Sequence, residues 1–370
     1  MAEPAALTEA GVVHGFVPTL TSFIGRVTAV GEVAGLLGEF RMVTVTGPGG
    51  VGKTRLASEV AWQVADRFAD GVWLAELAAV KDPAQLAAVV AGALGVRDQA
   101  GMPVAEALSR VLARKQLLLV LDNCEHLLAA AAKLARELLL AADDVRILAT
   151  SREPLCIVGE ARYRLPPLTV PLPGDPDGIA NSEAIALFAD RARRVDAHFA
   201  LGPETGPLAA RVVTRLDGIP LAIELAAARV EALGLVQLVD GLDDRFRLLT
   251  GTDRLAEARQ RSLTATADWS YQLLNEPEQR VFRALAAFPG SFSPDAAEAV
   301  SGPDAMPAVL HLVDCSLLTP PRAGPDGRPR YLMLETLRAY GAGLMAAAGE
   351  HEKVHAALAR YVGAHVIPQV

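Results

Sequence analysis

The chain has 370 residues, of which 51% are hydrophobic and 21% are charged. This balance excludes a disordered chain, which would combine low hydrophobicity with a high net charge, and at roughly 150 residues per domain the length predicts two to three domains. The formal net charge of −8 excludes an overall basic footprint for DNA or for an anionic membrane.

The three cysteines have no CxxC spacing and are odd in number. They predict neither a disulfide framework nor a zinc cluster, and a reducing compartment suits them. The sequence shows no signal peptide and no apolar run of the length that a membrane-spanning helix needs. We therefore expect a cytoplasmic protein without a membrane partner.

Residues 1–19 contain proline and glycine without a helical or strand period, and we interpret them as a leader. The sequence then alternates between short apolar strands and helices, with a helix expected at 54–69. Strands are predicted at 41–46 (RMVTVT), 71–77 (GVWLAEL), 116–122 (QLLLVLD) and 145–150 (VRILAT). The continuous apolar run at 116–122 is typical of a strand buried on both faces. Together they predict an α/β P-loop-type domain over residues 20–166, with a parallel sheet and helices on both faces.

A stretch rich in proline and glycine at 165–178 predicts a domain boundary. Helical sequence follows at 182–195, where Ser182 is expected to cap the first turn. A second helical run, at 207–233, is broken by Gly218 and Pro220. We assign a helical bundle to residues 167–255.

The next unit, from 262 to 340, reads as three helices followed by a hairpin. The expected hairpin strands are SLLTP (316–320) and RYLML (330–334), joined by a turn with glycine and proline. This order predicts a winged-helix domain over residues 256–341. Further helical sequence at 342–370 is interpreted as the start of a helical arm.

Residues 47–54, GPGGVGKT, match GxxxxGK[ST] in full and lie between a predicted strand and a predicted helix. Glycines let successive backbone N–H groups point at phosphate oxygens, and the following helix adds its positive dipole end. Lys53 supplies a positive charge to the β- and γ-phosphates, and Thr54 offers a hydroxyl to Mg²⁺. The predicted nucleotide-binding residues of this loop are Gly47, Gly49, Gly50, Val51, Gly52, Lys53, Thr54 and Arg55.

An alternative remains, because Gly47, Gly49 and Gly52 also fit the dinucleotide pattern GxGxxG, with Glu76 near the place of a ribose-binding acid. A dinucleotide fold has no use for a Lys-Thr pair. Asp122, at the end of the apolar strand, is placed as the Walker B carboxylate that holds Mg²⁺. A nucleoside triphosphate site is therefore favoured.

The residue after Asp122 is Asn123, where many hydrolysing NTPases carry a second acid that orients water. An amide cannot act as a base. Glu125 is a candidate to reach the water, or else a solvated acid of the loop. We therefore expect slow hydrolysis.

These motifs, in this order, resemble the STAND class of signal-transduction ATPases in its NB-ARC-like bacterial branch, over about 21–340. TSFIGR (21–26) looks like the adenine-side motif of that family, and LATSRE (148–153) looks like its sensor segment. LDGIPLAIELAAAR (216–229) looks like its GLPLA motif. The resemblance assigns the base and nucleotide to Phe23, Ile24, Gly25, Arg26, Pro220 and Leu221, and the γ-phosphate to Arg152.

The segment YLMLETLRAY (331–340) stands where the family carries its nucleotide-locking Met-His-Asp element. By position, Met333 matches the methionine, Leu334 the histidine and Glu335 the aspartate. The histidine is therefore replaced by leucine. The resemblance makes Leu334, Glu335 and Arg338 the candidates for the latch.

The resemblance implies an ATP/ADP-dependent molecular switch with Mg²⁺ as the metal. ADP would hold the domains closed, and ATP would open them into a form that assembles with further copies of itself. Members of this branch are mostly large transcriptional regulators of the LuxR and SARP types. The implied partners are thus self, an activator protein or ligand, and DNA through a separate effector domain, with this chain as a fragment or a stand-alone switch.

Two other classes of function stay open. The first is an ATPase that binds DNA through its own winged helix; nine acidic against six basic residues between 262 and 340 disfavour it, while Arg322, Arg328 and Arg330 on the wing support it. The second is a P-loop kinase or mechanical ATPase. Residues 178–370 show no basic lid or acceptor pocket of the kind that a kinase needs.

Overall fold

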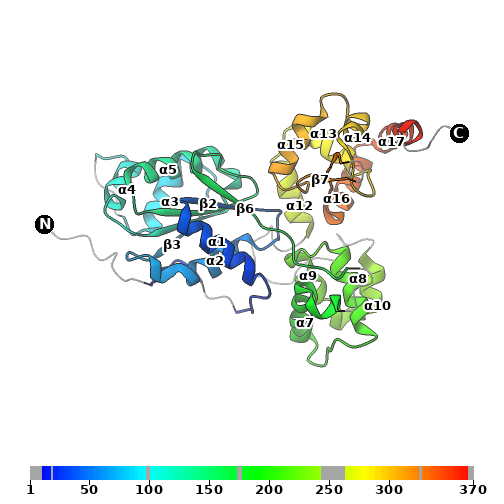
Figure 1. Ribbon diagram of the computed structural model, residues 1–370, viewed down its shortest axis with the longest axis horizontal. Helices are drawn as coiled ribbons and strands as arrows, with labels where there is room; N and C mark the ends of the chain where they lie inside the picture. Colours follow the sequence, from blue (N-terminus) through cyan, green and yellow to red (C-terminus); the bar gives the residue numbers. More distant parts are fainter. Residues whose placement is uncertain are drawn as a thin grey trace. The chain divides into compact units, whose positions relative to one another are not determined.

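The structure, a computed structural model, describes residues 11–17, 20–96, 101–172, 177–242, 263–324 and 327–365. The described residues form two compact units (Figure 1). The first comprises the chain up to Gly47 and from Gly52 to Pro166, and the second comprises Pro48–Val51 and the chain from Pro167 onward. In the part of the chain that is described, no helix has the length and apolar character to cross a membrane.

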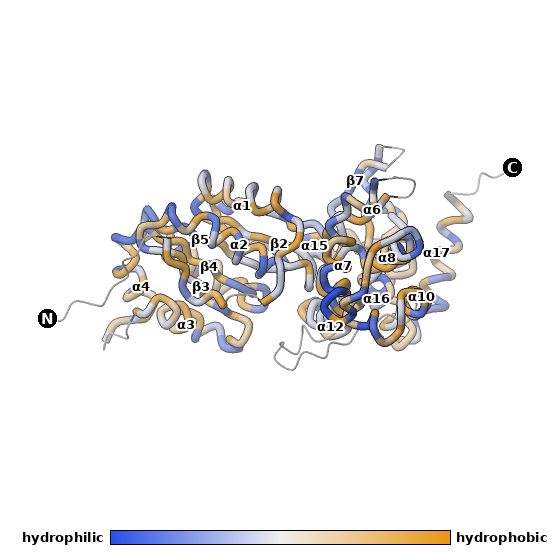
Figure 2. Tube along the Cα trace, turned by 90° about the horizontal axis from the view of Figure 1, so that it is seen from below, coloured by the Kyte–Doolittle hydropathy of each residue, from blue (hydrophilic) through white to orange (hydrophobic). Residues whose placement is uncertain are grey.

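The first unit is built on a parallel sheet in the strand order β1-β3-β4-β5-β2-β6. Its strands are β1 (Val13–His14), β2 (Met42–Thr46), β3 (Val72–Glu76), β4 (Leu118–Asp122), β5 (Arg146–Ser151) and β6 (Glu160–Arg164). Every residue of β2 and β4 is buried, and the hydropathy colouring of Figure 2 shows the hydrophobic character of the central strands. The four strands predicted from apolar runs are confirmed, as is the parallel α/β class.

Helices cover both faces of this sheet (Figure 1). They are α1 (Val27–Glu39), α2 (Lys53–Val64), α3 (Leu86–Ala93), α4 (Val104–Leu112) and α5 (Leu128–Ala141), with short 3₁₀ turns η1 (Ala65–Arg67), η2 (Pro83–Gln85) and η3 (Cys124–His126). Helices α1 and α2 pack together, and α3, α4 and α5 form a second group. The helix expected at 54–69 is shorter than predicted, because its last turn tightens into η1.

Two strands were missed by the prediction. The segment interpreted as a leader contains β1, whose His14 stacks on Trp73 with ring centroids 3.7 Å apart. Strand β6 lies at the other edge, beside β2. Its sequence EARYR is polar because an edge strand is half exposed, and Glu160 of β6 accepts a hydrogen bond from the Thr44 hydroxyl at 2.6 Å.

The second unit begins with a helical bundle, and its helices are α6 (Gly178–Asn181), α7 (Glu183–Val195), α8 (Thr205–Arg215), α9 (Pro220–Ala227) and α10 (Val230–Gly241). Ser182 caps α7 as predicted, since its hydroxyl accepts a hydrogen bond from the Ile185 amide at 3.2 Å. The predicted break in the helical run is also confirmed. Gly218 lies between α8 and α9, and Pro220 is the first residue of α9. The predicted boundary at 255/256 lies outside the described residues.

The remainder of the second unit has winged-helix form. Its elements are α12 (Leu263–Gln272), α13 (Glu276–Leu285), α14 (Pro294–Ser301), α15 (Ala305–Asp314), the antiparallel strands β7 (Arg322–Ala323) and β8 (Pro329–Arg330), α16 (Glu335–Ala347) and α17 (His351–His365). An isolated bridge between Phe292 and Tyr331 adds a third strand position beside the wing. As predicted, the α/β domain is followed along the chain by a helical bundle and then by a winged helix.

Two details of the predicted winged helix are wrong. The prediction of three helices omitted α14, an eight-residue helix that Ser293 caps through a hydrogen bond from the Ala296 amide. The hairpin strands lie closer to the turn than predicted and have two residues each. The apolar residues assigned to strands are instead core: Leu317, Leu318 and Tyr331 are buried in the aromatic cluster of this domain.

Candidate functional site

The GxxxxGK[ST] loop connects the carboxyl end of β2 to the first residue of α2, Lys53. Gly50 and Gly52 adopt φ values of +76° and +94°, a region that favours glycine, so the backbone accounts for glycine at these two positions. Gly52 is the N-cap of α2 and has no side chain to occupy the helix end. The glycine-rich loop thus ends at the N-terminus of α2, and the positive end of a helix is suited to binding an anion.

The Lys53 side chain lies in this loop. Its Nζ donates a hydrogen bond to the Gly47 carbonyl at 2.8 Å, and the residue is only 9% exposed. A buried ammonium group is costly without an anionic partner. The charge of Lys53 acts on the nearby carboxyl groups of Asp122 and Glu125, and the phosphates of a nucleotide would add further anionic groups.

The Asp122 carboxyl group, at the end of β4, lies next to the start of α2. The Thr54 hydroxyl donates to its Oδ1 at 2.8 Å, and the Thr150 hydroxyl, from β5, donates to the same oxygen at 2.5 Å. The Asn123 side-chain amide donates to Oδ2 at 2.7 Å. Burial raises the pKa of Asp122, while the hydrogen bonds from Thr150 and Thr54 act in the opposite direction. The predicted pair of Thr54 and Asp122 is thus brought together.

Glu125 and Arg152 form a buried ion pair beside this group. Arg152 Nε donates to Glu125 Oε1 at 3.2 Å, and the two side chains are 6% and 3% exposed. Burial acts to raise the pKa of Glu125, but the charges of Lys53 and Arg152 outweigh it and hold that pKa below its ordinary value. Glu125 Oε2 is buried without a hydrogen-bond partner among the described residues. Glu125 is therefore not a solvated loop acid; it is an ionised side chain of the site.

The donor set suits a Mg²⁺–nucleotide complex. Mg²⁺ prefers hard oxygen ligands and is usually held by one or two carboxylates, substrate phosphates and water. Thr54 Oγ1 and the Asp122 carboxylate supply such oxygens, and they lie within hydrogen-bonding distance of each other. With Lys53 on the same loop, the residues present fit both the metal and the phosphates.

The predicted adenine-side segment of the first unit is 21–26, with Phe23, Ile24, Gly25 and Arg26. Arg55, one residue after Thr54, donates from its guanidinium group to the Thr21 and Ser22 carbonyls at 2.9 and 3.0 Å. Its guanidinium carbon also lies 5.9 Å from the centre of the Phe23 ring. Arg55 therefore attaches this segment to the start of α2.

Pro220 and Leu221 are the first two residues of α9, which belongs to the second unit. The loop residues Pro48–Val51 belong to the same unit. The Leu221 amide donates to the Gly50 carbonyl at 3.2 Å. A Cβ atom on Gly50 would lie 2.9 Å from Leu221 Cβ, so glycine is needed here for the close approach as well as for φ. The GLPLA-like segment thus contacts the apex of the loop.

Of the three latch candidates, Leu334 is the N-cap of α16, Glu335 is its first residue, and the Arg338 amide closes the first turn on the Leu334 carbonyl at 2.8 Å. The backbone at the start of α16 is hydrogen-bonded to Asp217, which was not among the predicted site residues. Asp217 accepts hydrogen bonds from the Glu335 and Thr336 amides at 3.0 and 2.7 Å.

The prediction also missed Thr150, although it follows the apolar run of β5 as Asp122 follows that of β4. Parallel neighbouring strands bring such end residues together. This signal was available in the sequence.

One of the three wing arginines has an acidic partner, because Arg328 pairs with Asp295 at 3.5 Å on an exposed surface.

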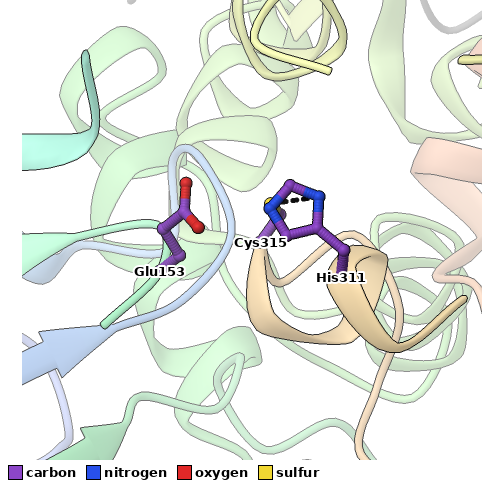
Figure 3. A group of neighbouring side chains, drawn as sticks. All are labelled: Glu153, His311 and Cys315. Carbon is purple, nitrogen blue, oxygen red and sulfur yellow. Dashed lines mark hydrogen bonds between the residues drawn. The ribbon is translucent and has the colours of Figure 1, made fainter. Parts of the chain in front are cut away.

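A second group of reactive side chains lies in the winged helix. His311 on α15 and Cys315 at its C-terminal end are one helical turn apart, with 3.4 Å between Nε2 and Sγ (Figure 3). Glu278 of α13 lies 2.8 Å from His311 Nδ1. Glu153, which Figure 3 also shows, belongs to the first unit.

Residues 39–162 match the family described as an AAA domain. Together with the parallel sheet, the phosphate loop and the carboxylate at the end of β4, this match defines an AAA-type P-loop NTPase domain, and nucleotide binding follows from that class. The Walker-type ATPase PABY2304 of Pyrococcus abyssi has the same fold: it is 13% identical, with a TM-score of 0.55, and the match covers 86% of this chain and 95% of that one.

Two proteins of Mycobacterium tuberculosis strain H37Rv are similar in sequence. The uncharacterized protein Rv0894 is 39% identical over 92% of this chain and 85% of its own length. Rv0890c, which carries the name of an HTH-type transcriptional regulator, is 44% identical over 87% of this chain. The chain therefore belongs to the same family as Rv0894, and it carries an AAA-type P-loop NTPase domain. It spans 35% of the length of Rv0890c.

Proposed function

We propose that the chain is an ATP/ADP-dependent switch module of a bacterial transcriptional regulator. The observation that carries this proposal is the arrangement at the end of β4. There the Thr54 hydroxyl is hydrogen-bonded to the Asp122 carboxyl group, and the buried charge of Lys53 lies on the adjoining loop. The similarity to Rv0890c supports a regulatory context, because that protein is named as a transcriptional regulator.

In this proposal the loop amides and Lys53 hold the phosphates, and Thr54 and Asp122 hold Mg²⁺. The metal, when bound, would neutralise charge on the β- and γ-phosphates. Arg152 is the residue that distinguishes ATP from ADP. In the structure its charge is neutralised by Glu125 at 3.2 Å, and a γ-phosphate would offer it a second anionic partner.

Hydrolysis in this site is slow. Asn123 follows Asp122, and its amide already donates to the Asp122 carboxylate. Glu125 is the remaining acid, but Arg152 holds one of its oxygens and its pKa lies below the ordinary value, which weakens it as a base. We expect kcat to stay below about 1 s⁻¹, near the lower end of typical enzymes.

The switch would act by changing which domains stay together. With ADP the module is closed; with ATP and Mg²⁺ it opens and assembles with further copies of itself, in response to an activator protein or ligand. DNA would be reached through a separate effector domain of a longer regulator. The short match to Rv0890c, 35% of its length, is consistent with a module of this kind. Light scattering of the chain with its activator tests this step, and an unchanged mass with ATP and Mg²⁺ would contradict it.

The binding site is tested by calorimetric titration of the Lys53→Ala variant with ADP and with Mg²⁺–ATP. Hydrogen bonds to charged groups contribute about 1.5–3 kcal/mol, so affinity for both nucleotides should fall at least about tenfold. Lys133→Ala is the matched control, because Lys133 is 79% exposed on α5. Both variants should melt cooperatively without ligand. An unchanged Kd for ADP in Lys53→Ala would refute the site.

A further inference from the structure

The N-terminus of α16 is capped by a residue from elsewhere in the chain. Leu334 is its N-cap, and a leucine side chain cannot accept the hydrogen bonds that the first amides offer. Asp217 supplies the acceptors: Oδ1 binds the Glu335 amide at 3.0 Å, and Oδ2 binds the amide and the hydroxyl of Thr336, each at 2.7 Å. One carboxylate of the helical bundle thus takes three hydrogen bonds from the winged helix.

The backbone around Asp217 is fixed tightly. Asp217 has a φ of +54°, and the next residue, Gly218, has a φ of +66°. A Cβ atom on Gly218 would lie 2.2 Å from the Leu168 carbonyl oxygen, and the Gly218 carbonyl accepts a hydrogen bond from the Leu168 amide at 2.9 Å. The Gly218 amide donates to the Val213 carbonyl at 3.0 Å. Such a turn cannot shift at one residue without shifting its neighbours.

The other end of the same short segment contacts the phosphate loop. Leu221 donates its amide hydrogen to the Gly50 carbonyl at 3.2 Å, and its side chain lies close to the position of a Cβ on Gly50. Ile219 Cγ2 would lie 3.5 Å from that same Cβ. Residues 217–221 therefore contact α16 at one end and the loop apex at the other.

We propose that residues 217–221 form the coupling segment of the switch, and that Asp217 is the latch that holds the winged helix closed. This inference rests on the proposed nucleotide switch. A change in the backbone of Gly50 on nucleotide exchange would move Leu221, and through the fixed turn it would withdraw the Asp217 carboxylate from Glu335 and Thr336. Asp217 is thus a positioning residue, since it touches α16 and acts on nucleotide choice through the segment.

The experiment compares Asp217→Asn with the wild-type chain. Asparagine keeps the shape but loses the charge and one acceptor oxygen, so the closed state is weakened. Allosteric couplings are typically 5- to 150-fold in affinity, and we expect the ratio of the ATP Kd to the ADP Kd to fall at least about fivefold. Asp196→Asn is the control, since that partly exposed aspartate accepts a local hydrogen bond from the His198 amide; its ratio should stay unchanged.

A second pair of variants keeps the test informative if Asp217→Asn does not fold. Thr336→Val removes one of the three hydrogen bonds at nearly constant shape. It should lower the ratio of the ATP Kd to the ADP Kd by less than Asp217→Asn does. Thr336→Ser keeps the hydroxyl and should have the wild-type ratio. Hydrogen exchange of the Glu335 and Thr336 amides in the wild-type chain should be faster with Mg²⁺–ATP than with ADP.

The outcomes separate this inference from the proposed function. Stable variants whose Kd ratio equals that of the wild type would overturn the latch, because a merely structural cap lowers stability without changing nucleotide preference. Equal exchange of the two amides with either nucleotide would overturn the coupling. A wild-type chain that binds neither nucleotide would instead refute the switch itself.

Discussion

The buried pair of Glu125 and Arg152 gives a prediction for Glu125→Gln. Glutamine keeps the shape of the side chain and its hydrogen-bond acceptor, but Arg152 loses the charge that neutralises it at 3.2 Å. Both side chains are nearly inaccessible, at 3% and 6% exposure, so water cannot replace the lost charge. Leaving one member of a buried ion pair uncompensated costs about 3–5 kcal/mol. Because glutamine retains the hydrogen bond, we expect the lower end, about 3 kcal/mol.

The assay is thermal unfolding of the intact chain without nucleotide, followed by calorimetry. In a domain of about 150 residues or more, 3 kcal/mol corresponds to a drop of roughly 6–12 °C in the Tm of that domain. Glu106→Gln is the control, because Glu106 and Arg110 form an exposed i,i+4 pair on α4 that contributes only about 0.3–0.5 kcal/mol. Bound ATP should reduce the deficit of Glu125→Gln, since phosphate offers Arg152 another anion. If both variants melted alike, the reasoning about the buried pair would be refuted.

Three further variants test other parts of the account. Thr54→Val should weaken Mg²⁺–ATP by about tenfold more than metal-free ADP in calorimetric titrations, because a hydroxyl ligand is lost; equal losses would count against a metal at this position. Gly218→Ala should lower stability by about 2 kcal/mol or more in urea unfolding, since its Cβ would meet the Leu168 carbonyl at 2.2 Å with a φ of +66°. The Arg283 hydrogen bonds hold the pKa of Glu350 below its ordinary value of 4.5, so this pair stabilises fully above that pH and is lost as the pH falls through the lower folded pKa. Glu350→Gln should therefore lose less Tm than the wild type between pH 7 and pH 3, and parallel curves would contradict this.

The site residues that sequence could predict are those in short contiguous motifs. Lys53 and Thr54 stand between an apolar strand and a helix, and Asp122 ends a strand that is buried throughout. For these residues local pattern and fold agree. The ion pair of Glu125 with Arg152 could not be predicted from a local motif. The two residues are 27 positions apart and come into contact only when β4 and β5 pair.

The parts of the fold that sequence missed lack an apolar pattern of their own. Strand β6, EARYR, is a polar edge strand, and β1 has two residues in a segment without a period. Asp217, the proposed latch, is separated from Thr336 by 119 positions, and a turn sequence such as LDGIP gives no sign of its distant partner. Long-range contacts of polar residues therefore had to come from the structure.

The most direct test of the central claim is to denature the freshly purified chain and identify the released nucleotide by chromatography. A closed switch with Lys53, Thr54 and Asp122 in place predicts near-stoichiometric ADP. A chain that is empty, and whose melting temperature does not rise with saturating ADP or Mg²⁺–ATP, would contradict the account, since ligand at about 1,000 times its Kd should stabilise the fold by about 4 kcal/mol.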